Sequence, residues 1–235
     1  MKTLKTLKEM GLAVVATVGL FAGTVSTQVN AEESIIITAK AQENITKNTS
    51  LLVDKTNQFN APSPEVNKLV KAYEQARPTM TEEQEKAAMK KIFNAQSIAI
   101  AEKANQLKAY SEQLKATIGS YYYALDTAKE YNSEEVKGLT LGEESSFWVE
   151  SLANIQSSFS VLERINSPQS HARAKSLLRR VNDLVHVYKI QLRHGAPTEE
   201  LVVETIYLLH DAESNVQLST VLLIAQAGAM MNFEE

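Results

Sequence analysis

The chain has 235 residues, with 24 Lys and Arg against 28 Asp and Glu, and 44% of its residues are hydrophobic. Because this apolar fraction is sufficient for a buried core, the composition excludes a globally disordered protein. Turn-forming residues are scarce, at 8 Gly and 5 Pro, which favours long helices over an all-β fold. The absence of Cys excludes a disulfide scaffold, a thiolate zinc site and a Cys nucleophile.

The first 31 residues have the features of a Sec-type signal peptide. Lys2, Lys5 and Lys8 precede an uncharged stretch over Gly11–Val25, and Val29-Asn30-Ala31 places small or aliphatic residues at positions −3 and −1. We therefore expect cleavage after Ala31 and a periplasmic or secreted protein. An uncleaved membrane anchor is the alternative, although the apolar run is shorter than the ~20 residues of a transmembrane helix.

Residues 32–63 differ in composition from the rest of the chain. The run Glu33-Ser34-Ile35-Ile36-Ile37-Thr38-Ala39 is β-prone, and a polar stretch follows that ends at Pro62 and Pro64. We interpret residues 32–63 as an extended, flexible arm with one or two helical turns near residues 51–59. The β-prone run resembles the TonB box of TonB-dependent outer-membrane receptors, but the chain lacks the strands of a plug and barrel. The resemblance implies an arm that adds as a strand to a partner's sheet.

From Pro64 onward, start and stop signals predict a helical domain over residues 64–235. Pro64 at the first position of a helix and Pro78 after its end delimit a short first helix. The capping box Thr81-Glu82-Glu83-Gln84 opens a second helix that runs to about residue 131. The segment Met80-Thr81-Glu82-Glu83-Gln84 also resembles the L-T-x-x-Q motif of the Spy/CpxP family of periplasmic chaperones. That resemblance implies a helical cradle that holds unfolded clients.

The second helix carries an a/d repeat over five heptads, as in a coiled coil. Small residues such as Ser97, Ala104 and Ser111 alternate with large ones, which favours close antiparallel approach by a neighbouring helix. At 1.5 Å per residue this helix is ~75 Å long, longer than any other predicted here. The repeat consists of Phe93, Ser97, Ile100, Ala104, Leu107, Ser111, Leu114, Ile118, Tyr121, Leu125 and Ala128.

Three further helices follow, over residues 140–166, 167–194 and 197–231. The end of the last one, Leu218–Met231, is apolar almost all round. Since it is too short to span a bilayer, we predict that neighbouring helices bury it. The fold class is therefore all-α: an elongated antiparallel helical bundle with one long coiled-coil-like helix, preceded by an extended N-terminal arm.

The last two helices have opposite charge. Residues 167–194 have a net charge of +5 and residues 198–231 a net charge of −5. An antiparallel hairpin turning near Ala196 pairs Arg193 with Glu199, Lys189 with Glu204, and Arg180 with Asp211 or Glu213. Each exposed pair is worth only ~0.2–1 kcal/mol, so their main effect is to specify register. The alternative is that the basic helix binds an anion, a lipid headgroup or nucleic acid.

No residue pattern typical of catalysis or metal binding occurs. The four histidines are His171, His186, His194 and His210, and Asp183-x-x-His186 has metal-ligand spacing only once, whereas a di-iron bundle needs it twice. Nucleophile elbows and phosphate-binding glycine loops are absent from the sequence. We therefore predict a protein that is not an enzyme and holds no metal or cofactor.

Aromatic residues concentrate at Tyr121-Tyr122-Tyr123, with Trp148 nearby in the sequence. Three consecutive Tyr on a helix cannot all face one core, and Tyr is favoured at interfaces. We take Tyr121, Tyr122, Tyr123 and Trp148 as a candidate interaction patch, with ordinary core and surface positions as the alternative.

These features predict an exported, non-enzymatic protein that acts by protein–protein contact, as an adaptor, scaffold or chaperone-like module. Its partner is another protein or a second copy of the chain. Removal of residues 1–31 leaves a net charge of −6 against −4 for the full chain, which disfavours nucleic acid as a partner. The competing class is a bundle that holds haem, a metal or a small apolar molecule between its helices.

Overall fold

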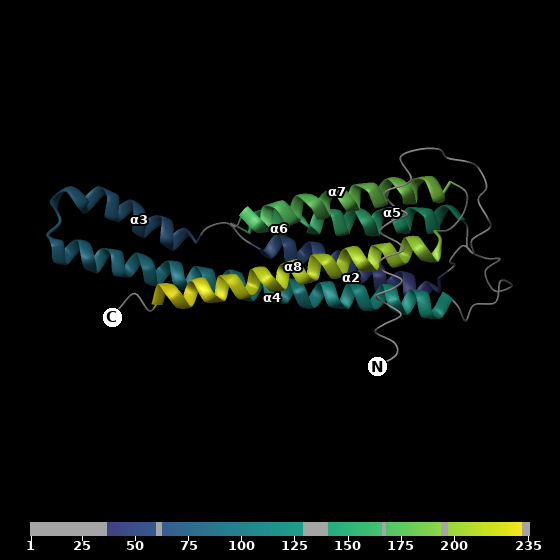
Figure 1. The fold of residues 1–235 in the computed structure, drawn as a ribbon, viewed down its shortest axis with the longest axis horizontal. Coiled ribbons are helices and arrows are strands. Elements are labelled where there is room, and N and C mark those ends of the chain that lie inside the picture. Colours follow the sequence, from purple (N-terminus) through teal and green to yellow (C-terminus); the bar gives the residue numbers. More distant parts are fainter. Residues whose placement is uncertain (1–36, 60–62, 129–140, 166–167, 194–196, 232–235) are drawn as a thin grey trace. The chain divides into compact units, whose positions relative to one another are not determined.

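The computed structural model describes residues 37–59, 63–128, 141–165, 168–193 and 197–231, within one compact unit, Glu33–Glu235. These residues form an all-α bundle (Figure 1), as predicted. The elements are α2 (Ala39–Gln58), α3 (Pro64–Ala76), the 3₁₀ turn η1 (Arg77–Thr79), α4 (Glu82–Ala128), α5 (Leu141–Ser158), α6 (Ser160–Arg164), α7 (Pro168–Gln191) and α8 (Glu199–Met231). The predicted signal peptide lies outside the described residues. In the described part of the chain, the helices are too short or too polar to cross a membrane.

The other helices are arranged around α4, which is 47 residues long. Its predicted capping box is formed: the Thr81 amide donates to Gln84 Oε1 at 3.0 Å, and the Gln84 amide donates to Thr81 Oγ1 at 3.3 Å. Figure 1 shows α8 running antiparallel along α4, with α3 beside the start of α4 and α2 beside its end. A second layer of α5, α6 and α7 packs on α2 and α8.

Small side chains bring α4 and α8 close together. Ser97 Oγ donates to the Ala227 carbonyl at 3.1 Å, and Ser111 Oγ donates to Glu213 Oε1 at 2.9 Å. Ala104, between these two serines, is 2% exposed. A serine hydroxyl reaches a backbone carbonyl on a neighbouring helix only when the two backbones lie close. The predicted antiparallel approach on the small residues of the heptad seam is therefore present.

The two halves of α4 are covered differently. In the first half Phe93 is 38% exposed, although it belongs to the predicted seam. In the second half the seam is buried, and a second row of residues on another face, including Tyr110, Thr117 and Ala124, is buried as well. The reason is that α2 packs on this second face, where Gln113 Nε2 donates to the Asn48 carbonyl at 3.1 Å.

The prediction of an extended arm is wrong for residues 39–58, which form α2. Thr38 caps this helix, since its Oγ1 accepts from the Ala41 amide at 3.0 Å. The buried stripe of α2 contains two threonines among its apolar residues, and this mixture hid the helical period. Both hydroxyls are satisfied within the helix, Thr49 by the Thr46 carbonyl and Thr56 by the Leu52 carbonyl, so they can be buried. The stripe consists of Ala41, Ile45, Thr49, Leu52 and Thr56.

The C-terminal end of α2 is fixed where α5 gives way to α6. The Ser158 carbonyl accepts from Thr56 Oγ1 and from the Tyr110 hydroxyl, both at 3.1 Å. Arg164 Nη1 donates to the Phe59 carbonyl at 3.2 Å and so binds a carbonyl left unpaired at the end of the helix. The junction between α5 and α6 therefore forms hydrogen bonds with both α2 and α4.

The α4–α8 seam predicts a matched pair of stability changes. Ala104→Leu adds a side chain where the backbones are too close for it, and we expect the free energy of unfolding to fall by ~1–3 kcal/mol. Ala109→Leu places the same side chain on the exposed face of α4, where a change within ~0.5 kcal/mol is expected. Urea titration followed by circular dichroism measures both; equal effects would contradict the close seam.

Candidate functional site

An aromatic cluster fills the core between α4, α5 and α7. The Trp148 ring centroid lies 6.2 Å from that of Tyr121, 5.8 Å from that of Tyr188 and 5.0 Å from that of Phe147. Trp148, Tyr121 and Tyr188 are completely buried. The predicted interaction patch is therefore wrong for Tyr121 and Trp148. Tyr121 is a seam position of α4 and faces the core, and Trp148 lies on the inner face of α5.

The three consecutive tyrosines point in three directions, as 100° steps along a helix require. Tyr121 is buried, while Tyr122 is 47% exposed and its ring centroid lies 6.2 Å from that of His210 on α8. Tyr123 packs partly against the core, with Lys40 Nζ from α2 at 6.0 Å from its ring centroid. Of the predicted patch, Tyr122 is thus the residue that presents a largely accessible ring.

Within the described residues, two polar groups in the aromatic cluster have no hydrogen-bond partner: the Tyr121 hydroxyl and the Trp148 indole N–H. The neighbouring Tyr188 hydroxyl, in contrast, lies 2.9 Å from Thr205 Oγ1 and 3.3 Å from the Leu201 carbonyl. Burial raises the pKa of both the Tyr121 and Tyr188 phenols well above the ordinary value, so both stay neutral. The aromatic cluster therefore contains uncharged polar groups, and only some of them have hydrogen-bond partners.

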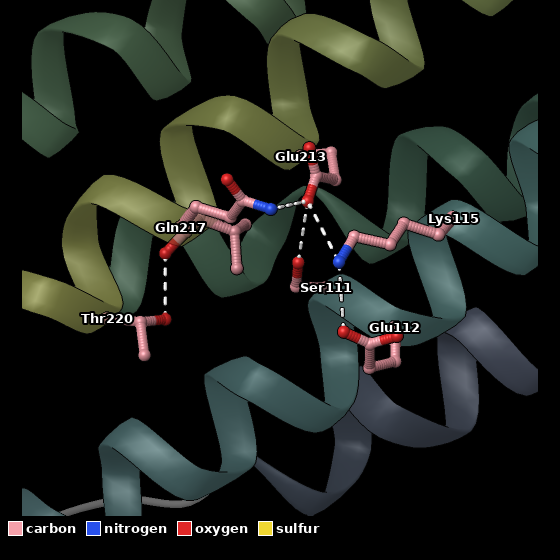
Figure 2. A network of polar contacts seen from close by, with 7 residues as sticks. Ser111, Glu112, Lys115, Glu213, Gln217 and Thr220 are labelled. Carbon is pink, nitrogen blue, oxygen red and sulfur yellow. Dashed lines mark hydrogen bonds and ion pairs between the residues drawn. The ribbon is translucent and has the colours of Figure 1, made fainter.

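A second polar network lies in the α4–α8 seam (Figure 2). Its centre is Glu213, which is 8% exposed and accepts hydrogen bonds from Ser111 Oγ and Gln217 Nε2. Lys115 Nζ lies 3.8 Å from the same carboxylate oxygen and 3.0 Å from Glu112 Oε1. A buried carboxylate is tolerated when it is paired and hydrogen-bonded in this way.

The position of Glu213 corrects one of the predicted hairpin pairs. Its carboxylate contacts α4 and not Arg180, because its position on α8 faces the seam. Arg180 Nη1 pairs with Asp211 Oδ2 instead, in the predicted register. The Tyr188–Thr205 contact between α7 and α8 fits the same register.

The remaining hairpin pairs have different outcomes. No ion pair joins Lys189 to Glu204 among the described residues. Partial burial of Glu204 raises the pKa of its carboxyl, an effect that the positive charge of Arg180 opposes. The pairing of Arg193 with Glu199 stays a prediction.

The outer face of α8 near its C-terminus is apolar and exposed. Val221 is 62% exposed and Ile224 58%, and Leu218 and Leu222 are nearly half exposed. This part of the helix, residues 218–231, contains no charged side chain. The prediction that neighbouring helices bury it on all sides is wrong. It packs on α4 through Ser219 and Ala227, whereas α7 contacts the earlier part of α8. We call Leu218, Val221, Leu222 and Ile224 the α8 apolar face.

Two open grooves on the described part of the chain offer room for a small molecule. One, of about 550 Å³, lies between α2 and α5 and has charges of both signs, from Lys47 and Glu150. The other, of about 330 Å³, lies between α3 and α4 and includes Leu69 and Ile98. Within the described ranges, His, Asp and Glu side chains do not gather in any group of three or more that could hold a metal ion.

No protein-family model, curated protein or solved structure matches this chain. Fold and surface alone therefore define its class, which is an all-α helical bundle with an exposed apolar helix face.

Removal of the phenol hydroxyl should have different effects on stability at the two buried tyrosines of the aromatic cluster. Tyr188→Phe removes a hydroxyl that is hydrogen-bonded to α8, and we expect a loss of about 1 kcal/mol in the free energy of unfolding. Tyr121→Phe removes a hydroxyl without a protein partner, and we expect no loss or a small gain, because an unsatisfied buried group is itself unfavourable. Thermal and urea unfolding measure both changes; a larger loss for Tyr121→Phe would show that its hydroxyl is satisfied.

Proposed function

We propose that this protein is exported and acts without catalysis, binding another polypeptide as an adaptor or chaperone-like module. The observation that carries the proposal is the α8 apolar face. Contiguous exposed apolar surface on a folded chain marks interaction sites, because leaving it in water is unfavourable. The N-terminal lysines, apolar run and Val29-Asn30-Ala31 support the export.

The binding surface extends from the α8 apolar face towards Tyr122. His210 and Val221 are eleven residues apart on α8, close to three full turns, so they share one side of the helix. Tyr122 of α4 lies against His210. The surface therefore offers aliphatic side chains at one end and a half-exposed phenol at the other, which suits an apolar segment or an amphipathic helix of a partner.

A ligand-binding bundle is the second candidate, because the Tyr121 hydroxyl and Trp148 indole N–H are buried without partners. An absorption spectrum and metal analysis of protein purified from its native host separate the two functions. We expect neither a Soret band nor stoichiometric metal. Either result would favour the second candidate.

Disruption of the α8 apolar face should abolish partner capture. The mature wild-type protein should enrich its partner polypeptides from extract of its native host. We expect the double variant Val221→Lys, Ile224→Lys to capture at least about tenfold less of these polypeptides. Ala109→Lys, Ala116→Lys adds the same charge at exposed positions of α4 and should capture the same polypeptides as the wild type. Quantitative mass spectrometry of the captured material is the measurement. Equal capture by both double variants would rule out this face.

Export predicts a defined mature N-terminus. Intact-mass analysis of the protein from its native host should give a chain that begins at Glu32, found outside the cytoplasm. A full-length chain anchored in the membrane would contradict cleavage, and a cytoplasmic chain would contradict export.

A further inference from the structure

A row of basic residues runs along the outside of α7. Lys175, Arg179, Lys189 and Arg193 lie on one face of the helix and the turn after it, because Asn182 and His186 complete a series with steps of four and three residues. All four basic side chains are exposed. We call these four residues the basic stripe. Its eighteen-residue extent corresponds to ~27 Å of helix.

Two acidic residues of α8, Asp211 and Glu213, do not pair with the basic stripe. Asp211 pairs with Arg180, on a different face of α7, and Glu213 pairs with α4. The ion pairs of these two acids, with Arg180 and with Lys115, leave the basic stripe out. Asp183 is the one acidic residue in the α7 sequence. The stripe therefore places four exposed positive charges on a mature chain whose net charge is −6.

We propose that the basic stripe binds the anionic headgroups of a phospholipid membrane. The argument is charge complementarity: four exposed cations in a row, on a face of α7 that borders α5 at the Asn182–Gln156 contact, meet a plane of phosphates without a groove. Ile190, 45% exposed, lies beside the stripe and can enter the headgroup layer.

Two other partners fit these features less well. An acidic peptide is recognised by a compact cluster of Arg side chains, whereas the basic stripe spreads two Arg and two Lys over ~27 Å of α7. Nucleic acid is usually met by a broader basic surface than a row along one helix. The membrane surface is a separate partner from the polypeptide proposed for the α8 apolar face.

Flotation of the mature chain with lipid vesicles tests the proposal. We expect it to float with vesicles that contain one third phosphatidylglycerol in phosphatidylcholine, and not with phosphatidylcholine alone. The bound fraction should fall steeply as sodium chloride is raised, because the interaction is screened. Absence of binding to the anionic vesicles, or binding that salt does not weaken, would overturn the proposal.

Matched variants separate the stripe from net charge. The variant with Lys175, Arg179, Lys189 and Arg193 all changed to Gln should bind anionic vesicles at least about tenfold more weakly. Changing the exposed Lys68, Lys71, Lys86 and Lys108 to Gln removes the same charge from α3 and α4 and should leave binding within about twofold. Equal losses would show that net charge alone is responsible, which overturns the assignment to α7.

Two further measurements keep the result independent of folding and of partner class. Arg179→Lys, Arg193→Lys retains the charge and should bind vesicles like the wild type, whereas failure of this variant would overturn a purely electrostatic contact. Circular dichroism establishes that each compared variant is folded. Binding to polyglutamate or to duplex DNA that is tighter than binding to the anionic vesicles would overturn the choice of partner.

Discussion

The close contact between α4 and α8 is the constraint on which the rest of this structure depends. Ser97, Ala104 and Ser111 keep the side chains between the two helices short, and serine hydroxyls reach across to α8. Close packing of this kind gains dispersion energy along the whole contact and excludes larger side chains. It also fixes register, since the Ser111–Glu213 bond forms in one alignment only (Figure 2).

The same contact determines which surfaces remain for binding. Because α8 faces α4 along its length and α7 covers only its earlier part, the outer side of residues 218–231 is left open. The apolar composition of this stretch is thus divided between a buried side, at Ser219 and Ala227, and an exposed side, at Val221 and Ile224. The small residues that contact α4 and the large aliphatic residues that stay exposed therefore lie on opposite sides of α8.

Charge is distributed by the same geometry. Glu213 faces the seam and is held by Ser111 and Lys115, so it is removed from the acidic face that α8 presents to α7. One predicted pair, Arg180 with Asp211, forms in the expected register. The basic residues Lys175, Arg179, Lys189 and Arg193 lie on another face of α7 than Arg180 and are exposed.

The sequence by itself determined the all-α class, the bounds of most helices and the antiparallel approach on small residues, because caps, prolines and the three-and-four period are local signals. It did not reveal α2, whose buried stripe includes Thr49 and Thr56; these threonines are compatible with a core only after their hydroxyls find carbonyls. Only the tertiary structure decided which side of Glu213 and Val221 is covered. Burial at those positions depends on where each neighbouring helix begins and ends. The periodicity of a single helix does not contain that information.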